Sequence, residues 1–131
     1  MLLFGSGRVA KPVMKLFESH DNVFITIATN DLAQGQELVN ALKPHNRFRA
    51  NIVDFKFPAG NDLLPSLFAQ CDVAISLLPA TMHLPLAEEA IRQKKHFVTA
   101  SYTSPAMRQL DEQAKQAGII LLNEMGLVGY F

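Results

Sequence analysis

A glycine-rich run near the start of the chain has the residue types and spacing of a phosphate-binding turn. It reads Gly5-Ser6-Gly7-Arg8-Val9-Ala10, of the form G-x-G-x-x-A. In such a turn Gly5 permits tight bending, Gly7 lets a pyrophosphate approach the backbone, and the small Ala10 allows a helix to pack closely on a strand. The following helix would offer unpaired N–H groups and a positive dipole end to the phosphates. The run therefore predicts a dinucleotide site over Gly5 to Val9, with an ordinary strand–helix turn as the alternative.

A second group of candidates lies about twenty residues further on, where dinucleotide-binding proteins read the adenosine ribose. The sequence there has Asn30 and Asp31. An acid at this place bonds a free 2′-hydroxyl and favours NAD, whereas an arginine accommodates the 2′-phosphate of NADP. Asp31 inclines the prediction towards NAD, but it is equally suited to capping the next helix. Asp54 either faces the adenine edge or begins a turn.

The elements that must position these residues alternate along the chain. Short apolar runs predict strands covered on both faces, at Met1-Phe4, Val23-Ala28, Arg49-Val53, Val73-Leu78, His96-Ala100 and Ile119-Leu122. Amphipathic stretches predict helices between them, at Arg8-Glu18, Asp31-Leu42, Asp62-Ala69, Leu84-Gln93 and Pro105-Gln116. Parallel strands joined by right-handed helical crossovers form a doubly wound sheet. We therefore expect an α/β fold of Rossmann type, three layers deep, with six strands in the order 3-2-1-4-5-6.

Capping residues support several of these helices. Ser104 is suited to capping a helix whose first position is Pro105, and Gly118 is suited to ending it. Asn61 is the candidate cap of the third helix. Pro12 lies deeper in the first helix, where we expect it to remove one hydrogen bond and distort the first turns.

Composition narrows the classes of function. The chain has 131 residues, 49% of them hydrophobic, with twelve Lys and Arg balancing twelve Asp and Glu. A neutral chain of this kind suggests one globular domain and no nucleic-acid partner. The apolar run at Met1-Phe4 is too short for a signal peptide or a membrane span, and a single Cys71 suggests no disulfide. We expect a cytoplasmic protein, no membrane association and no metal site, because the four histidines are scattered.

From Asp72 onwards the sequence is more specific than a generic dinucleotide-binding fold, and the chain resembles the saccharopine dehydrogenase family, also called saccharopine reductases. The resemblance covers nearly the whole chain and rests on four stretches: Leu3 to Val9 with Pro12, Asp72 to Pro79 with His83, Val98 to Tyr102 with Ser104 to Met107, and Asn123 to Leu127. The match to the family is specific because three runs occur together in one chain: I-S-L-L-P-A-T-M-H, V-T-A-S-Y and N-E-M-G-L.

This resemblance implies an oxidoreductase of lysine metabolism. Enzymes of the family use NAD or NADP to oxidise saccharopine at its secondary amine, and the imine formed is hydrolysed. Carried over residue by residue, Gly5 to Val9 would hold the pyrophosphate, while Ser76, Leu77 and Leu78 would line the ribose and nicotinamide side. Ala100 would belong to the same cofactor site. Ser101 and Tyr102 would contact saccharopine.

Some of these roles have alternatives. The family position that reads the 2′ group corresponds to Asn30, which is neither the Asp of NAD-dependent members nor the Arg of NADP-dependent ones. His83 either faces the nicotinamide as a proton relay or packs at the start of its helix. Ser101 and Tyr102, without the family match, would be a loop cap and a rim aromatic.

The family continues into an Asp-Pro-Gly segment and a larger substrate domain. The sequence here reads Gly126-Leu127-Val128-Gly129-Tyr130-Phe131 and stops, with Val128 in place of the substrate-contacting Asp. We therefore expect a single dinucleotide-binding domain over 1–131, without the substrate domain, that binds cofactor but turns over little or no substrate. Carboxynorspermidine synthase is a related enzyme alternative. A stand-alone nucleotide-binding regulator is the alternative outside the enzymes, and a homodimer through the apolar C-terminal residues is plausible.

Overall fold

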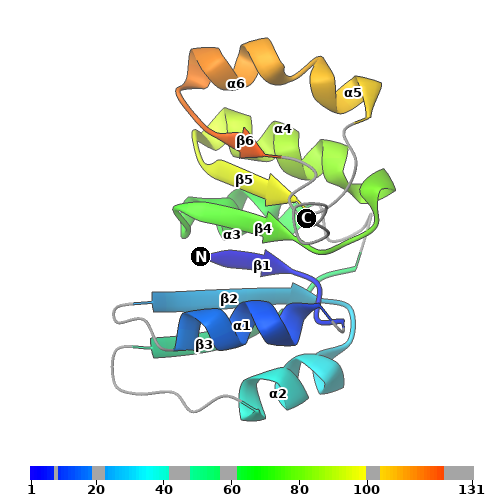
Figure 1. Cartoon of the computed structure of the whole chain (residues 1–131), viewed down its shortest axis with the longest axis vertical. Coiled ribbons are helices and arrows are strands. Elements are labelled where there is room, and N and C mark those ends of the chain that lie inside the picture. Colours follow the sequence, from blue (N-terminus) through cyan, green and yellow to red (C-terminus); the bar gives the residue numbers. More distant parts are fainter. Residues whose placement is uncertain (8, 19–22, 42–47, 57–61, 100–103, 123–131) are drawn as a thin grey trace, which may run out of the picture.

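The computed structural model describes residues 1–7, 9–18, 23–41, 48–56, 62–99 and 104–122. Its centre is a six-stranded sheet in the order β3-β2-β1-β4-β5-β6, with every neighbouring pair parallel (Figure 1). The strands are β1 Leu2–Phe4, β2 Val23–Thr29, β3 Phe48–Asp54, β4 Val73–Ser76, β5 His96–Thr99 and β6 Leu121–Leu122. The predicted Rossmann-type fold and strand order are confirmed.

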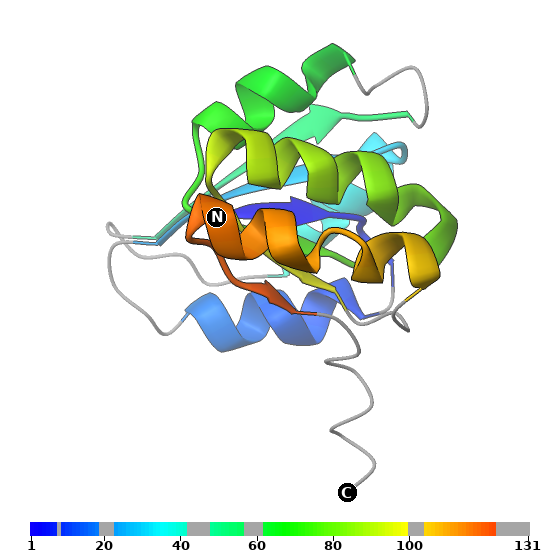
Figure 2. The ribbon, with the colours of Figure 1, turned by 90° about the horizontal axis from the view of Figure 1, so that it is seen from above.

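The helices are the crossovers between these strands. They are α1 Ala10–Glu18, α2 Leu32–Asn40, α3 Leu64–Ala69, α4 His83–Gln93, α5 Pro105–Arg108 and α6 Asp111–Ala117, with a 3₁₀ turn, η2, at Ala80–Met82. Figure 2 shows α1 on one side of the sheet and α3 and α4 on the other. This two-sided cover follows from right-handed crossovers that run outward from β1 in opposite directions.

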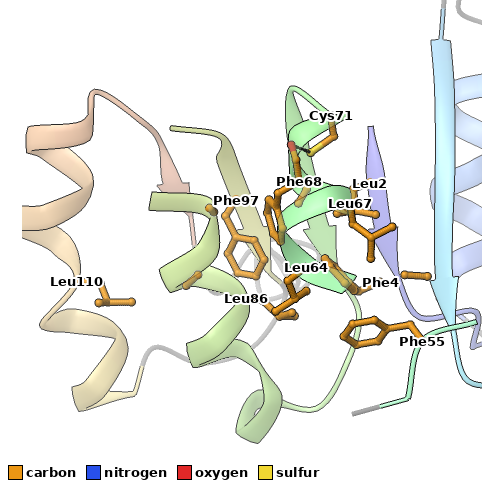
Figure 3. Close-up of a cluster of buried hydrophobic side chains, with 14 of the residues drawn as sticks. Leu2, Phe4, Phe55, Leu64, Leu67, Phe68, Cys71, Leu86, Phe97 and Leu110 are labelled. Carbon is orange, nitrogen blue, oxygen red and sulfur yellow. Dashed lines mark hydrogen bonds between the residues drawn. The ribbon is translucent and has the colours of Figure 1, made fainter. Parts of the chain in front are cut away.

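Two apolar cores result, one on each face. The smaller core joins β1 and β2 to α1 and α2, with Leu3, Met14, Ile25 and Ile27 wholly buried. The larger core, drawn in Figure 3, lies beneath α3 and α4. At its centre the Phe4 ring meets Phe55 edge-on at a centroid distance of 5.3 Å and lies 5.9 Å from Phe68. Neighbouring residues of β1 therefore face opposite cores, as alternation along a strand requires.

The first helix is less disturbed by proline than the sequence suggested. The helix α1 begins at Ala10, so Pro12 occupies its third position. Backbone N–H groups in the first turn have no partner within the helix, and a proline there removes no hydrogen bond. The expected loss of a bond at Pro12 is therefore wrong.

The C-terminal helical region is broken where one helix was predicted. Ser104 caps α5 by accepting the Met107 N–H at 3.2 Å, as expected, and Gly118 ends α6 with φ at 73°. Between them the Leu110 N–H bonds the Met107 carbonyl at 3.1 Å, a tight turn that separates the two helices. The buried Met107, Leu110 and Ala114 keep helical spacing across this turn, which is why periodicity did not reveal it.

Other boundaries differ by one or two residues. The helix α3 begins at Leu64, after a 3₁₀ turn, and the predicted cap Asn61 is outside the described residues. The strand β4 ends at Ser76 instead of Leu78, because the Ser76 hydroxyl accepts the Leu78 N–H at 3.3 Å and turns the backbone. The backbone leaves the sheet here, and the two residues after Ser76 enter a loop.

Candidate functional site

A cleft of about 570 Å³ opens at the carboxyl ends of the first four strands. Open parallel sheets place ligands at this edge, where neighbouring crossovers leave in opposite directions, and here that point lies between β1 and β4. The volume is within the range of small-molecule and cofactor sites. The described lining residues are Gly5, Ser6, Gly7, Ala28, Thr29, Asn30, Gln34, Phe55, Lys56, Leu77, Leu78, Pro79 and Met82.

The glycine-rich turn forms one wall of this cleft. Its first glycine, Gly5, has φ at 102°, a conformation that side chains rarely adopt, and its N–H bonds the Ala28 carbonyl at 2.9 Å. A Cβ built on Gly5 would lie 3.5 Å from the side chains of Leu77 and Leu78. Gly7 differs, since a Cβ there would meet no described atom within 4 Å. Gly5 is thus needed for the turn itself, and Gly7 leaves the cleft open.

Ser6 holds this turn to the end of β2. Its side chain is buried, and its hydroxyl lies 2.6 Å from the Thr29 hydroxyl and 2.9 Å from Gln34 Oε1. Thr29 Oγ1 also accepts the Asp31 N–H at 3.1 Å. The Ser6 side chain is therefore engaged within the protein, and the turn is fixed against the start of α2.

The three residues expected to read the adenosine are placed differently. Asn30 is exposed and lines the cleft. Asp31 caps α2, accepting the Gln34 N–H at 3.0 Å through Oδ1, and does not line the cleft. Asp54 ends β3 with an exposed side chain, also outside the lining residues. Of the two readings of Asp31, the geometry therefore supports the helix cap.

The expected nicotinamide side is formed by the loop after β4. Leu77 and Leu78 line the cleft, and the Leu77 N–H bonds the Phe4 carbonyl at 2.9 Å, which holds the loop beside β1. Ser76 is fully buried and lies behind this wall, where its hydroxyl supports the Leu78 backbone. Its side chain is separated from the cleft by the loop that it shapes.

The remaining candidates lie away from the cleft or outside the described residues. Val9 precedes α1 with 60% of its surface exposed, and it is not a lining residue. Arg8, Ala100, Ser101 and Tyr102 fall outside the described residues. The expectations for these four residues stay predictions.

Several lining residues were not anticipated from the sequence. Thr29 and Gln34 flank the predicted adenosine position, Phe55 and Lys56 follow β3, and Met82 belongs to η2. The rule that ligands bind beyond the carboxyl ends of strands would have pointed to Lys56, because it follows a predicted strand by a few residues. Gln34 gives no such signal, since its place depends on how α2 starts.

His83 lies on the core side of the sheet and is not among the lining residues. Its Nδ1 is 3.1 Å from the Thr99 hydroxyl, and its ring meets Phe97 edge-on at 6.2 Å. Burial lowers the pKa of His83, and the Leu78 carbonyl partly opposes this shift. The arrangement supports the packing role over a proton relay at the nicotinamide.

This lowered pKa makes stability depend on pH. Below the ordinary histidine pKa of 6.5 the unfolded chain takes up a proton that the folded His83 resists, so stability is lost as the pH falls from about 6.5 towards the folded value. We expect urea unfolding at pH 7.5 and pH 5.5 to show a larger loss for the wild type than for His83→Asn. Equal losses in both proteins would contradict this assignment, since the other histidines are common to them.

Other kinds of site find little support in the described ranges. Within residues 1–7, 9–18, 23–41, 48–56, 62–99 and 104–122, no three His, Cys, Asp or Glu side chains are grouped to hold a metal ion. Cys71 is buried and donates weakly to the Phe68 carbonyl, and burial raises the pKa of its thiol. No helix in the described part of the chain has the length and apolar character to span a membrane.

Comparison with known proteins agrees with this geometry. A model of the saccharopine dehydrogenase NADP-binding domain matches residues 1–122. Saccharopine dehydrogenase (NADP(+), L-glutamate-forming) of Saccharomyces cerevisiae is 39% identical over 127 residues, covering 97% of this chain and 27% of the yeast protein. Mitochondrial alpha-aminoadipic semialdehyde synthase of Rattus norvegicus is 35% identical over 97% of this chain and 13% of its own length.

Solved structures show the same relationship. The apo yeast saccharopine dehydrogenase (L-Glu forming) superposes with a TM-score of 0.79 and 37% identity, over 95% of this chain and 26% of that one. Shikimate dehydrogenase of Mycobacterium tuberculosis has a TM-score of 0.65 at 17% identity over 97% of this chain and 46% of that one, and shows the fold alone. The chain thus spans about a quarter of its yeast relative. The description of the matching domain favours NADP and does not support the inclination towards NAD.

Proposed function

Because the chain belongs to the saccharopine dehydrogenase family, through that family's NADP-binding domain, we propose that its cleft binds NADP(H). The observation that carries this proposal is the open space at Gly7. This residue lines the cleft beside a turn that the chain holds in a positive-φ conformation, yet no described atom occupies the place of its missing side chain. A pyrophosphate requires such close access to the backbone.

The residues that line the cleft indicate where each part of the cofactor would lie. The pyrophosphate would lie against Gly5 to Gly7, at the positive end of α1. The adenosine would extend over the end of β2, beside Asn30, and the nicotinamide towards the loop of Leu77 and Leu78. The apolar side chains of that loop would exclude water from one face of the nicotinamide ring.

The activity proposed for the whole enzyme is oxidation of saccharopine. Relatives of this chain in Saccharomyces cerevisiae and Pyricularia oryzae are named saccharopine dehydrogenase (NADP(+), L-glutamate-forming). In the proposed reaction NADP(+) would accept the hydride. The residues described here bind and orient the cofactor, while Ser101 and Tyr102 are the proposed substrate contacts. Near-attack geometry also needs groups that hold the substrate over the nicotinamide, and in a relative about four times as long as this chain such groups can come from the remaining three quarters of the protein.

The proposal is tested by titrating the purified 131-residue chain with NADPH and NADH and following the fluorescence of the reduced nicotinamide. We expect saturable binding of both, with NADPH at least about tenfold tighter, the difference that one good charge-assisted contact supplies. Saccharopine turnover with NADP(+) on the same sample should be negligible. Absence of binding to either nucleotide would refute the cofactor site, and turnover at rates near about 10 s⁻¹ would refute the assignment to a partial active site.

A further inference from the structure

We propose that Gln34 and Lys56 form the subsite that recognises the 2′-phosphate of the cofactor's adenosine ribose. This inference rests on the proposed binding of NADP(H) and names the residues that select it over NAD(H). Neither residue belongs to the glycine-rich turn or to the position that usually reads the ribose, which here is Asn30. Both residues line the cleft.

The first argument is the charge of the cleft. No Asp or Glu is among its described lining residues, and Lys56 is the one charged side chain there. Asp31 has the sequence position to bond a ribose 2′-hydroxyl, but its carboxylate accepts the backbone N–H of Gln34 as the cap of α2. The acid that would favour NAD is therefore a helix cap outside the residues that line the cleft, and the charge of Lys56 attracts an anion.

The second argument is the orientation of the Gln34 amide. With the Gln34 amide oxygen towards Ser6, the single hydroxyl proton of Ser6 goes to Gln34 Oε1 at 2.9 Å, and Thr29 is the donor in the 2.6 Å contact with Ser6. The other acceptor within reach of the Thr29 hydroxyl, the Asp31 carbonyl, is more distant at 3.4 Å. Thr29 in turn accepts the Asp31 N–H at 3.1 Å. All the donors in this chain of hydrogen bonds point the same way, towards the Gln34 carbonyl. The Gln34 NH₂ group is then left as a donor for the cleft.

The helix α2 holds this donor in place. Next to Gln34, Gly35 packs so closely that an added Cβ would lie 3.1 Å from Thr29 Cγ2 and 3.3 Å from Ile52 Cγ2. The first turn of α2 is thereby held against both β2 and β3. Gln34 therefore lies over the carboxyl-terminal half of these two strands.

Lys56 approaches the cleft from β3. The preceding Phe55 donates its N–H to the Thr29 carbonyl at 2.8 Å and buries its ring against Phe4. The Lys56 backbone is thus held beside the end of β2, while its side chain is exposed. Among the described residues Lys56 makes no ion pair, so its ammonium is free to meet a phosphate.

Together the two groups suit a phosphate dianion. An amide NH₂ contributes a directed donor, and a lysine ammonium acts as a point charge that binds phosphate oxygens. A free 2′-hydroxyl carries no charge and gains little from the ammonium. The pair therefore strengthens NADP(H) binding and leaves NAD(H) binding nearly unaffected.

The first test replaces Gln34 by Glu, which keeps an oxygen to accept from Ser6 and places a negative charge in the cleft. We expect NADPH affinity to fall about 10- to 100-fold while NADH affinity stays the same or rises. Gln36→Glu is the matched control, since it makes the same charge change two residues along α2, where Gln36 bonds Asn40 outside the cleft. The control should keep the wild-type ratio of affinities.

The second test replaces Lys56 by Gln, with Lys94→Gln as the control at the exposed end of α4. We expect Lys56→Gln to weaken NADPH by about tenfold and NADH by less than about twofold. Competition by adenosine 2′,5′-bisphosphate and by 5′-AMP isolates the 2′-phosphate, and only the bisphosphate should lose affinity in both variants.

The outcomes separate this inference from the proposed function. If the wild type binds neither nucleotide, the cofactor site itself is wrong. If the wild type prefers NADPH and both variants, folded by circular dichroism, keep that preference, the subsite lies elsewhere and the inference is overturned. A selective loss of NADPH and of the bisphosphate supports it.

Discussion

Replacing Gly7 with alanine is expected to abolish NADP(H) binding while the fold stays intact. The new methyl group would meet no described atom, so we expect the free energy of unfolding to change by less than about 1 kcal/mol. The methyl would instead occupy the space through which a pyrophosphate reaches the backbone, because Gly7 lines the cleft. We expect at least about a 100-fold loss of NADPH affinity, measured by fluorescence titration, since a misplaced pyrophosphate forfeits several charge-assisted contacts.

Two further glycine variants serve as controls. Gly118→Ala lies in a positive-φ position at the end of α6, away from the cleft, and should cost about 1 kcal/mol of stability without changing affinity. Gly5→Ala should lower both the stability and the cofactor affinity, because a side chain at Gly5 would be strained by the φ of 102° within the turn itself. Wild-type affinity in Gly7→Ala would show that the phosphates do not approach this wall of the cleft.

The second large effect is expected at Phe4. This side chain is fully buried at the centre of the larger core, between Phe55 and Phe68 (Figure 3). Phe4→Ala should lower the free energy of unfolding by about 3–5 kcal/mol through lost burial and the cavity left behind. Domains of this size are stable by about 5–15 kcal/mol, so the variant would be marginally folded, as urea denaturation would show.

Phe24→Ala is the matched control for this prediction. Phe24 lies on β2 with 53% of its side chain exposed, and its loss should cost no more than about 1 kcal/mol. Equal destabilisation by the two substitutions would mean that the core is not centred on Phe4. Because Phe55 both packs on Phe4 and lines the cleft, Phe4→Ala should also weaken cofactor binding under conditions where it remains folded.

The fold was largely predictable because its signals are local and repeated. Each strand is a short apolar run between helical stretches, and the handedness of crossovers leaves few sheet orders open. Boundaries were less certain where a single side chain decides them. The hydroxyl of Ser76 ends β4 by bonding two residues ahead, and Leu110 joins a tight turn that divides α5 from α6. Both details depend on contacts that periodicity does not encode.

The lining of the cleft was predictable at the glycine-rich turn, where we propose that the phosphates bind, and less so beyond it. Gly5 and Gly7 have the spacing that predicts a phosphate-binding turn, whereas the single carboxylate of Asp31 has two possible uses at the same sequence position. Only the start of α2 decides between them. Gln34 reaches the cleft because Asp31 caps that helix and Ser6 engages the amide oxygen, a set of contacts with no counterpart in a linear motif.

The place of β1 in the sheet bears on the order in which the protein can fold during synthesis. This strand precedes the other five strands in the sequence and has only three residues, yet it has partners on both sides. Leu2 pairs with Thr26 in β2 and with Ala74 in β4, so one side of the strand can pair once β2 has been made, and the other must wait for β4, which follows β2 and β3 in the sequence. Contacts between parts so distant in the sequence form slowly. Until they form, the unpaired apolar edge of β1 can associate with other chains. Nascent chains in which β4 has not yet emerged from the ribosome would therefore hold an exposed Leu2–Phe4 edge, and they are the species that chaperones would be expected to bind.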